Sequence, residues 1–377
     1  MASILILFKV LLLESHNTTK YNKLIVYKLR GKIFMKKWLS FIVISLIAVF
    51  ALAACGGNDD STETDDATSE TQTEENGSQE SESGETYKVG ATQIVEHPSL
   101  DRAFEGFKAA LADAGLDVEY DYQNAQADQN NVKTISDNFV ADNVDLIFAN
   151  STPSAEGALN ATKEIPIVFT SVTDPVAAKL VEAMDKPGPN ITGVTDLHPD
   201  AIKNTVEFID KYFEGAEVGI VYNAGEPNSV AQIEAIKEAA EGTSLTISER
   251  TVANSSEVHQ AAMTLAGDVD VFYIFTDNTV VSALESVVSV ANEQQIPLVV
   301  GEPDSLQKGG FATFGIDYYT IGYRAGELAV EILTGQKTPD QINVEYPPEL
   351  QLFINKEAAE LQGVEWNAEW DDIAEFM

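Results

Sequence analysis

The residues with the clearest capacity for chemistry are polar side chains that directly follow short apolar runs. In the first half, hydroxyl and amide groups follow "VDLIFA" and "IPIVFT": Asn150, Ser151, Thr152, Ser171 and Thr173. In the second half, acids and amides follow "VDVFYIF" and "IPLVVG": Asp277, Asn278 and Glu302. Hydroxyls and backbone N–H groups suit a carboxylate, whereas carboxylates suit an ammonium. This division favours a small zwitterionic ligand held between two lobes. The alternative is that these residues only cap helices.

The elements that must position these residues form an internal repeat. The segment "YKVGATQIVEHPSLDRAFEGFKAAL" from Tyr87 matches "AEVGIVYNAGEPNSVAQIEAIKEAA" in the second half, and the segment from Val144 matches that from Val269 at nearly the same separation. Each half reads as strands alternating with helices, from apolar β-rich runs and 3.6-residue periodicity. Such alternation predicts an α/β fold with two doubly wound parallel-sheet lobes.

Composition excludes several classes of function. The net charge of -37, from 60 acids and 23 bases, argues against a nucleic-acid partner because phosphates would be repelled. A single cysteine and four scattered histidines offer no Cys-rich or paired-histidine metal site. We find no GxSxG, P-loop or GxGxxG motif. We therefore expect no enzyme activity, no metal and no cofactor.

The single cysteine, Cys55, follows an export signal. Met35 and two lysines precede the apolar run 38–51, and the small residues of "LAAC" follow it. This pattern resembles the lipobox of bacterial lipoproteins, which implies lipidation of Cys55 and anchoring on the extracytoplasmic face of the cell membrane, at a Gram-positive type of surface. The alternatives are a transmembrane helix with a chance cysteine, or an ordinary soluble export signal.

Two segments flank this signal peptide, which we assign to 35–54. Residues 1–34 have no domain-like pattern, and we interpret them as an upstream extension with Met35 as the true start; the rival is a genuine cytoplasmic or second membrane segment. Residues 55–86 combine the lipidated cysteine with a tether that has eleven acids and no bases after Asn58. Because such a segment cannot bury enough apolar surface to fold, we expect it to be disordered.

Several motifs in the remaining chain carry a family resemblance. "EHPSLDRAFEGFKAAL", "IPIVFTSVTDPVAAKLV", "VYNAGEPNSVAQIEAIK", "FTDNTVVSA" and "GGFATFGIDYYTIGYRAGELAVEIL" occur in this order between Tyr87 and Val364. Together they resemble the ABC-transporter substrate-binding family that includes tryptophan-binding lipoproteins. The resemblance implies a type I periplasmic-binding-protein fold whose lobes close on a ligand. It also implies two protein partners, a membrane permease and an ATPase. The implied ligand is an aromatic amino acid, with tryptophan as the first candidate, and we expect the protein to be a monomer.

Placed on this fold, the sequence divides into two lobes. We assign residues 87–192 and about 318–340 to lobe 1, and 193–317 with part of 341–377 to lobe 2. Glycine-flanked connections at 188–196 and 309–319 are the predicted hinges.

The candidate ligand-binding residues follow from the positions just described. We expect Ser151, Thr152, Ser171 and Thr173, with backbone N–H groups around Val172, to bind a carboxylate. The candidates for the ammonium are Asp277 and Asp317, with Glu226 or Glu302 behind them. Asn228 and Asn278 would orient the ligand, and Tyr222, Phe169 and Tyr318 would flank an aromatic side chain. His97 lies in the first loop, as a cap or lid residue rather than a ligand contact.

Three other functions remain open. An enzyme would use the cleft carboxylates for chemistry, without any of the motifs sought above. A sensor domain would bind the same ligand and signal instead of delivering it. A binding protein for another small polar solute would share the fold but not the ligand.

Overall fold

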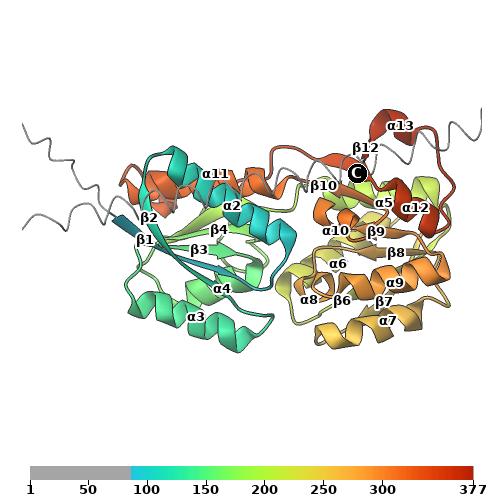
Figure 1. Ribbon diagram of the computed structural model, residues 1–377, viewed down its shortest axis with the longest axis horizontal. Coiled ribbons are helices and arrows are strands. Elements are labelled where there is room, and N and C mark those ends of the chain that lie inside the picture. Colours follow the sequence, from blue (N-terminus) through green and yellow to red (C-terminus); the bar gives the residue numbers. More distant parts are fainter. Residues whose placement is uncertain (1–85, 377) are drawn as a thin grey trace, which may run out of the picture. The chain divides into compact units, whose positions relative to one another are not determined.

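The computed structural model describes residues 86–376, which belong to one compact unit, Glu80–Met377. The predictions on the upstream extension, the signal peptide and Cys55 lie outside the described residues. The described part forms two β-sheets flanked by helices (Figure 1). Within it, no helix has the length and apolar character needed to cross a membrane.

The first sheet has five parallel strands in the order β2-β1-β3-β4-β5. Its strands are β1 (Thr86–Gln93), β2 (Asp117–Asn124), β3 (Leu146–Asn150), β4 (Ile167–Val172) and β5 (Ile191–Thr195). Its helices are α2 (Pro98–Asp113), α3 (Gln129–Ala141), α4 (Thr152–Ala161) and α11 (Tyr318–Leu333), followed by the 3-10 turn η2 (Pro339–Gln341). Thr86, which the sequence assigned to the tether, is the first residue of β1.

Helices cover both faces of this sheet because successive strand residues point to opposite sides. In β3, Leu146 and Phe148 pack toward α2 and α11, whereas Ile147 and Ala149 pack toward α3 and α4. Both faces are therefore apolar, as in a parallel sheet buried on two sides.

The second sheet has seven strands in the order β12-β11-β10-β9-β8-β6-β7. Its strands are β6 (Glu217–Tyr222), β7 (Thr246–Thr251), β8 (Val271–Ile274), β9 (Leu298–Val300), β10 (Ala312–Gly315), β11 (Gln351–Ile354) and β12 (Glu375–Phe376). All neighbouring strands are parallel except β10 and β11, which are antiparallel. The α/β fold with two largely parallel sheets is confirmed, and β11 is the exception to the predicted pattern.

The helices of the second sheet also lie on both faces. They are α5 (Ala201–Tyr212), α6 (Pro227–Ala240), α7 (Val258–Leu265), α8 (Asn278–Val281), α9 (Leu284–Gln294), α10 (Pro303–Gln307), α12 (Lys356–Leu361) and α13 (Trp370–Ile373), with the 3-10 turn η1 (Ser255–Glu257) before α7. One apolar cluster joins α5 and α6 to the sheet, and another joins α7 and α9 to its opposite face. Val218 of β6 and Val89 of β1, matched in the internal repeat, occupy corresponding strands of the two sheets.

Four helices begin with a proline in their first two positions: α2, α4, α6 and α10. Proline suits these positions because the first helical N–H groups have no partner within the helix. Each of these helices follows the carboxyl end of a strand, so the loops before them gather at that edge of each sheet.

The chain passes between the two sheets three times: at 196–200, at 316–317 and at 342–350. Two of these passages lie in or beside the glycine-flanked connections. The third was not among the predicted hinges, although the assignment of 318–340 to lobe 1 and of part of 341–377 to lobe 2 requires a crossing there. The third passage is bound to β5, since Thr195 N donates to Glu345 O at 2.9 Å. The Arg324 guanidinium of α11 also holds the Glu345 carboxylate with two hydrogen bonds of 2.8 Å.

Candidate ligand-binding site

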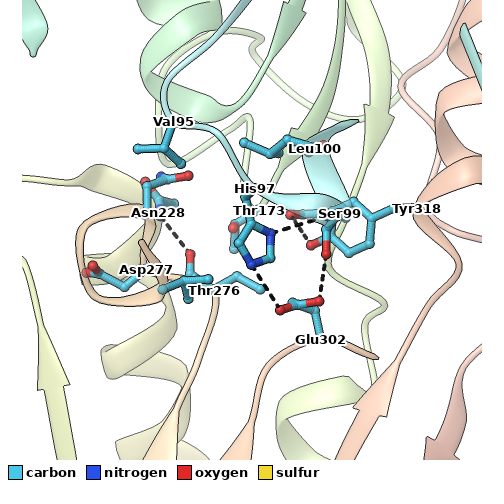
Figure 2. A pocket seen from close by; sticks show the side chains of 14 residues that line it. Val95, His97, Ser99, Leu100, Thr173, Asn228, Thr276, Asp277, Glu302 and Tyr318 are labelled. Carbon is cyan, nitrogen blue, oxygen red and sulfur yellow. Dashed lines mark hydrogen bonds and ion pairs between the residues drawn. The ribbon is translucent and has the colours of Figure 1, made fainter. Parts of the chain in front are cut away.

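A pocket with about 430 Å³ of empty space, open solvent included, lies where the loops of the two sheets meet. Its lining residues come from both sheets and from the passages between them (Figure 2). They are Val95, His97, Ser99, Leu100, Ser171, Thr173, Asp196, Asn228, Thr276, Asp277, Asn278, Val281, Glu302 and Tyr318. The first sheet supplies hydroxyl groups, and the second supplies two buried carboxyl groups.

Ser171 lies at the hydroxyl-rich side in a strained backbone conformation. Its φ of 56° is in the left-handed region, next to a register shift between β4 and β5. Its hydroxyl donates to Asn150 Oδ1 at 2.7 Å, which fixes the turn. A non-glycine residue in this region costs free energy, and such strain concentrates at ligand sites. The turn is thus held ready for a ligand beside Thr173.

The start of α4 carries a second strained serine. Ser151 has φ 149°, and its hydroxyl accepts a hydrogen bond from Ser154 N at 3.2 Å as the helix N-cap. Next to it, Thr152 Oγ1 is buried without a hydrogen-bond partner within the described residues. Neither residue lines the pocket. A buried polar atom without a partner is uncommon.

Asp277 is the acid at the opposite side. Its carboxylate accepts hydrogen bonds from Asn223 N at 2.6 Å, Ser229 Oγ at 2.6 Å and Val280 N at 2.8 Å. Burial, with the nearby Glu226 charge, raises the pKa of Asp277 to about 7. A cation placed beside it would offset this desolvation and favour the charged carboxylate.

Glu226 supports the pocket wall instead of lining it. Its carboxylate accepts hydrogen bonds from Asn278 N and Nδ2, at 3.1 and 2.6 Å, and from Thr279 N and Oγ1. It therefore fixes the start of α8, which presents Asn278 to the pocket. Asn228 donates from Nδ2 to Thr276 O at 3.1 Å, while its buried Oδ1 has no partner among residues 86–376.

His97 and Glu302 face each other across the pocket (Figure 2). His97 Nδ1 accepts a hydrogen bond from Ser99 N at 3.3 Å as the N-cap of α2, and its Nε2 lies 3.7 Å from Glu302 Oε1. Burial lowers the pKa of His97 to about 4, so the ring is neutral at pH 7 and the contact is not an ion pair. Nε2 then carries the proton.

Asp196 and Tyr318 join two of the passages between the sheets. The Tyr318 hydroxyl donates to Asp196 Oδ2 at 3.0 Å, and both residues line the pocket. Burial raises the pKa of Asp196 to about 6, and its Oδ1 has no partner within the described residues.

Several predicted site residues lie elsewhere. Asp317 caps α11 and binds Arg102 at 2.8 Å, outside the pocket, because its carboxylate is taken by the helix end. The Tyr222 hydroxyl binds Glu249 at 3.0 Å instead. Val172 and Phe169 are fully buried in β4, as core residues.

The structure also brings residues to the pocket that were not among the predicted contacts: Val95, His97, Ser99, Leu100, Asp196, Thr276 and Val281. Several follow β1 or begin α2, and the "EHPS" stretch was a signal for these because it precedes a helix at a strand's carboxyl end. Asp196 offered no such signal, since its place depends on the path of the chain between the sheets.

A polar pocket between two α/β sheets that are joined by three chain passages defines a ligand-binding protein of two lobes. The family model for ABC transporter substrate binding proteins matches residues 88–374. The chain therefore belongs to the ABC transporter substrate-binding family, a family of binding proteins and not of enzymes.

Named relatives and solved structures support this membership. A tyrosine-binding protein of Clostridioides difficile is 40% identical over 85% of this chain and 91% of its own length. A Streptococcus structure in complex with L-Trp is 31% identical, with a TM-score of 0.74 over 78% of this chain and 100% of that one. The ligand-free, open form of a Clostridium difficile substrate-binding protein with adhesive properties is 37% identical over 77% of this chain and 99% of that one, with a TM-score of 0.59.

Proposed function

We propose that this chain captures a free aromatic amino acid, tyrosine or tryptophan, for an ABC importer. The observation that carries the proposal is that the first sheet gives the pocket hydroxyls and the second gives it two buried acids, in a chain that is 40% identical to a tyrosine-binding protein. The sequence alone favours tryptophan, and the relative's name favours tyrosine. Because a second relative has been solved in complex with L-Trp, we test both tyrosine and tryptophan as ligands.

The two polar sides of the pocket set the ligand's orientation in this proposal. The ammonium binds Asp277, which would otherwise keep a desolvated carboxyl without a cation. The carboxylate binds the hydroxyls of Ser171 and Thr173, which line the pocket on the side of the first sheet. The aromatic ring lies against the apolar side chains in the lining, which are Val95, Leu100 and Val281, with Tyr318 beside them.

The test is calorimetric titration with each of the twenty amino acids, and then with Asp277→Asn. We expect tyrosine or tryptophan to bind, and the variant to lose about 100-fold in affinity, since a charge-assisted contact contributes about 1.5–3 kcal/mol. The control is Asp137→Asn, an exposed acid of α3 whose loss should leave binding unchanged. Binding of a sugar or another polar solute, with no aromatic amino acid bound, would refute the proposal.

We also propose that a lipid on Cys55 holds the chain at the extracytoplasmic face of the membrane, where it delivers ligand as a monomer to a permease with an ATPase. A diacylated cysteine anchors stably, because two chains bury enough CH₂ groups where one does not. Replacement of Cys55 by Ala should release the protein into the medium, whereas Ser61→Ala should not. Continued membrane association of Cys55→Ala would contradict the anchor.

A further inference from the structure

Three buried residues meet where α2 of the first sheet faces α10 of the second. Ser99 Oγ lies 2.6 Å from Glu302 Oε2 and 2.7 Å from Asp304 Oδ2. The three side chains are almost fully buried, with exposed fractions of 2%, 3% and 9%. Ser99 thus links one lobe to two carboxyl groups of the other.

The number of protons in this cluster is fixed by its geometry. A serine hydroxyl has one proton, so Ser99 donates to only one of the two carboxyl groups. The other contact, at hydrogen-bond distance, needs a proton from its own carboxyl group. Without it, two oxygens with only lone pairs would face each other.

The partners of the two acids show which one carries that proton. Glu302 accepts hydrogen bonds from Asp304 N at 2.7 Å and from Ser305 Oγ, in addition to Ser99. Among the described residues, the carboxyl group of Asp304 has one hydrogen-bonding partner, the hydroxyl group of Ser99. Glu302 is therefore satisfied as a carboxylate, and Asp304 is satisfied as a neutral acid that donates to Ser99 Oγ.

We propose that Asp304, Ser99 and Glu302 form a proton-dependent clamp between the lobes, in which Asp304 takes up a proton as the lobes close, so that ligand is held less tightly as the pH rises. This inference rests on the proposed function for its ligand. Burial raises the pKa of both acids, but hydrogen bonds from Ser305, Ser99 and the Asp304 backbone N–H lower that of Glu302, whereas the Glu302 charge raises that of Asp304 further.

The charged and titratable groups around the clamp do not replace this proton. They are His97, Asp101 and Arg102 at α2, Lys308 at the end of α10, and Asp196 and Tyr318 from the passages. Arg102 would favour a charged Asp304, but its guanidinium is bound to Asp317 at 2.8 Å. His97 is neutral at pH 7, and its Nε2 faces Glu302.

The sign of the pH effect follows from the direction of the pKa shift. An open cleft exposes Asp304 to water, where its pKa is ordinary, and closure raises that pKa. At a pH between the pKa values of Asp304 in the open and closed forms, closure takes up a proton. The affinity for ligand therefore falls by up to about tenfold per pH unit as the pH rises. His97 and Asp277 act in the opposite direction, because closure disfavours protonated His97 and the ligand's ammonium disfavours protonated Asp277.

The experiment compares variants in which those opposing groups are unchanged. The number of protons taken up on tyrosine or tryptophan binding is measured by calorimetry at pH 5 to 7 in buffers of different ionisation enthalpy. Asp304→Asn places an amide donor where the neutral acid donates, so we expect it to keep the clamp without a proton. It should take up fewer protons than the wild type and lose less affinity between pH 5 and 7. Asp113→Asn, at the far end of α2, is the matched control and should behave as the wild type.

Ser99→Ala removes the link and should raise the dissociation constant at pH 5 by about tenfold. Equal proton uptake and equal pH dependence in the wild type and Asp304→Asn would overturn the clamp, as would unchanged binding in Ser99→Ala.

A second readout needs no ligand. The clamp predicts that the wild type loses unfolding free energy relative to Asp304→Asn as pH rises from 5 to 8. The same difference at every pH would overturn the clamp even if no amino acid binds. Failure of all amino acids to bind, with this pH-dependent difference present, would refute the proposed ligand and not the clamp.

Discussion

Asp196 shows at the residue scale how a buried acid without a cation limits stability. Its pKa of about 6 lies above the ordinary value of 3.8, chiefly because of burial. A carboxyl whose folded pKa is raised stabilises fully below its unfolded pKa and loses that contribution as pH rises through the folded value. The described chain therefore keeps a group that favours folding in acid and opposes it at neutral pH.

Asp196→Asn should remove this dependence. The amide oxygen of the asparagine can still accept a hydrogen bond from the Tyr318 hydroxyl. Between pH 4 and pH 8, we therefore expect the unfolding free energy of the variant to rise relative to that of the wild type by on the order of 3 kcal/mol. Urea unfolding at both pH values measures the difference. A constant difference at the two pH values would contradict the assignment.

At the scale of elements, α2 and α11 pack through glycines. A Cβ at Gly322 would lie 1.9 Å from Ala103 O, and one at Gly106 would lie 2.2 Å from Tyr319 O. The backbones thus approach too closely for any side chain at these positions. This contact matters for the site, because α2 begins with the clamp serine and α11 begins with Tyr318.

Gly322→Ala should therefore destabilise the chain by about 3 kcal/mol, since overpacking against backbone forces the helices apart. Gly267→Ala is the matched control, because a Cβ there meets nothing within 4 Å. Thermal or urea unfolding of both variants tests the contact. Equal stability of the two would show that the helices move apart without cost.

The C-terminal helix α13 anchors the second sheet through one side chain. Trp370 is buried against Phe208, Tyr212 and Phe311, whereas Trp366 is 37% exposed. We expect Trp370→Ala to cost about 3–5 kcal/mol of unfolding free energy. Trp366→Ala should cost only about 1 kcal/mol, mainly from its contact with the Lys356 ammonium. Urea denaturation compares them, and a similar cost for both would mean that α13 does not anchor the sheet.

The helices and strands could be predicted from the sequence, but the residues of the site could be predicted only in part. The sequence could predict Ser171, Thr173, Asp277 and Glu302, because each lies at or just after the carboxyl end of a parallel strand, and such ends meet at one edge of a sheet. Asp317 follows a strand too, yet its carboxylate caps α11, and sequence does not reveal which hydrogen bonds such a group already makes.

Other parts of the site depend on contacts between distant segments. Ser99 meets Asp304 across 205 positions, and Tyr318 meets Asp196 across 122. The local periodicity of the sequence does not predict contacts between residues so far apart. The same holds for Trp370, whose burial depends on the path of the chain after β11.

For the whole molecule, the fold implies two lobes that move about three passages. The third passage is fastened to the first sheet by Glu345 with Arg324, so closure must be taken up at the ends of the passages rather than by their detachment. A ligand that binds the closed form more tightly than the open form shifts the population toward the closed form.

We expect saturating tyrosine or tryptophan to make the protein more compact at pH 8, where the clamp is weakest and the open form most populated. The radius of gyration from small-angle scattering should fall on ligand addition, and fall less at pH 5, where the clamp already favours closure. Ser99→Ala should show the larger change at both pH values, because its lobes lack the hydroxyl that joins them. Scattering that is independent of both pH and ligand would mean that the lobes do not open in solution, and that ligand enters without their separation.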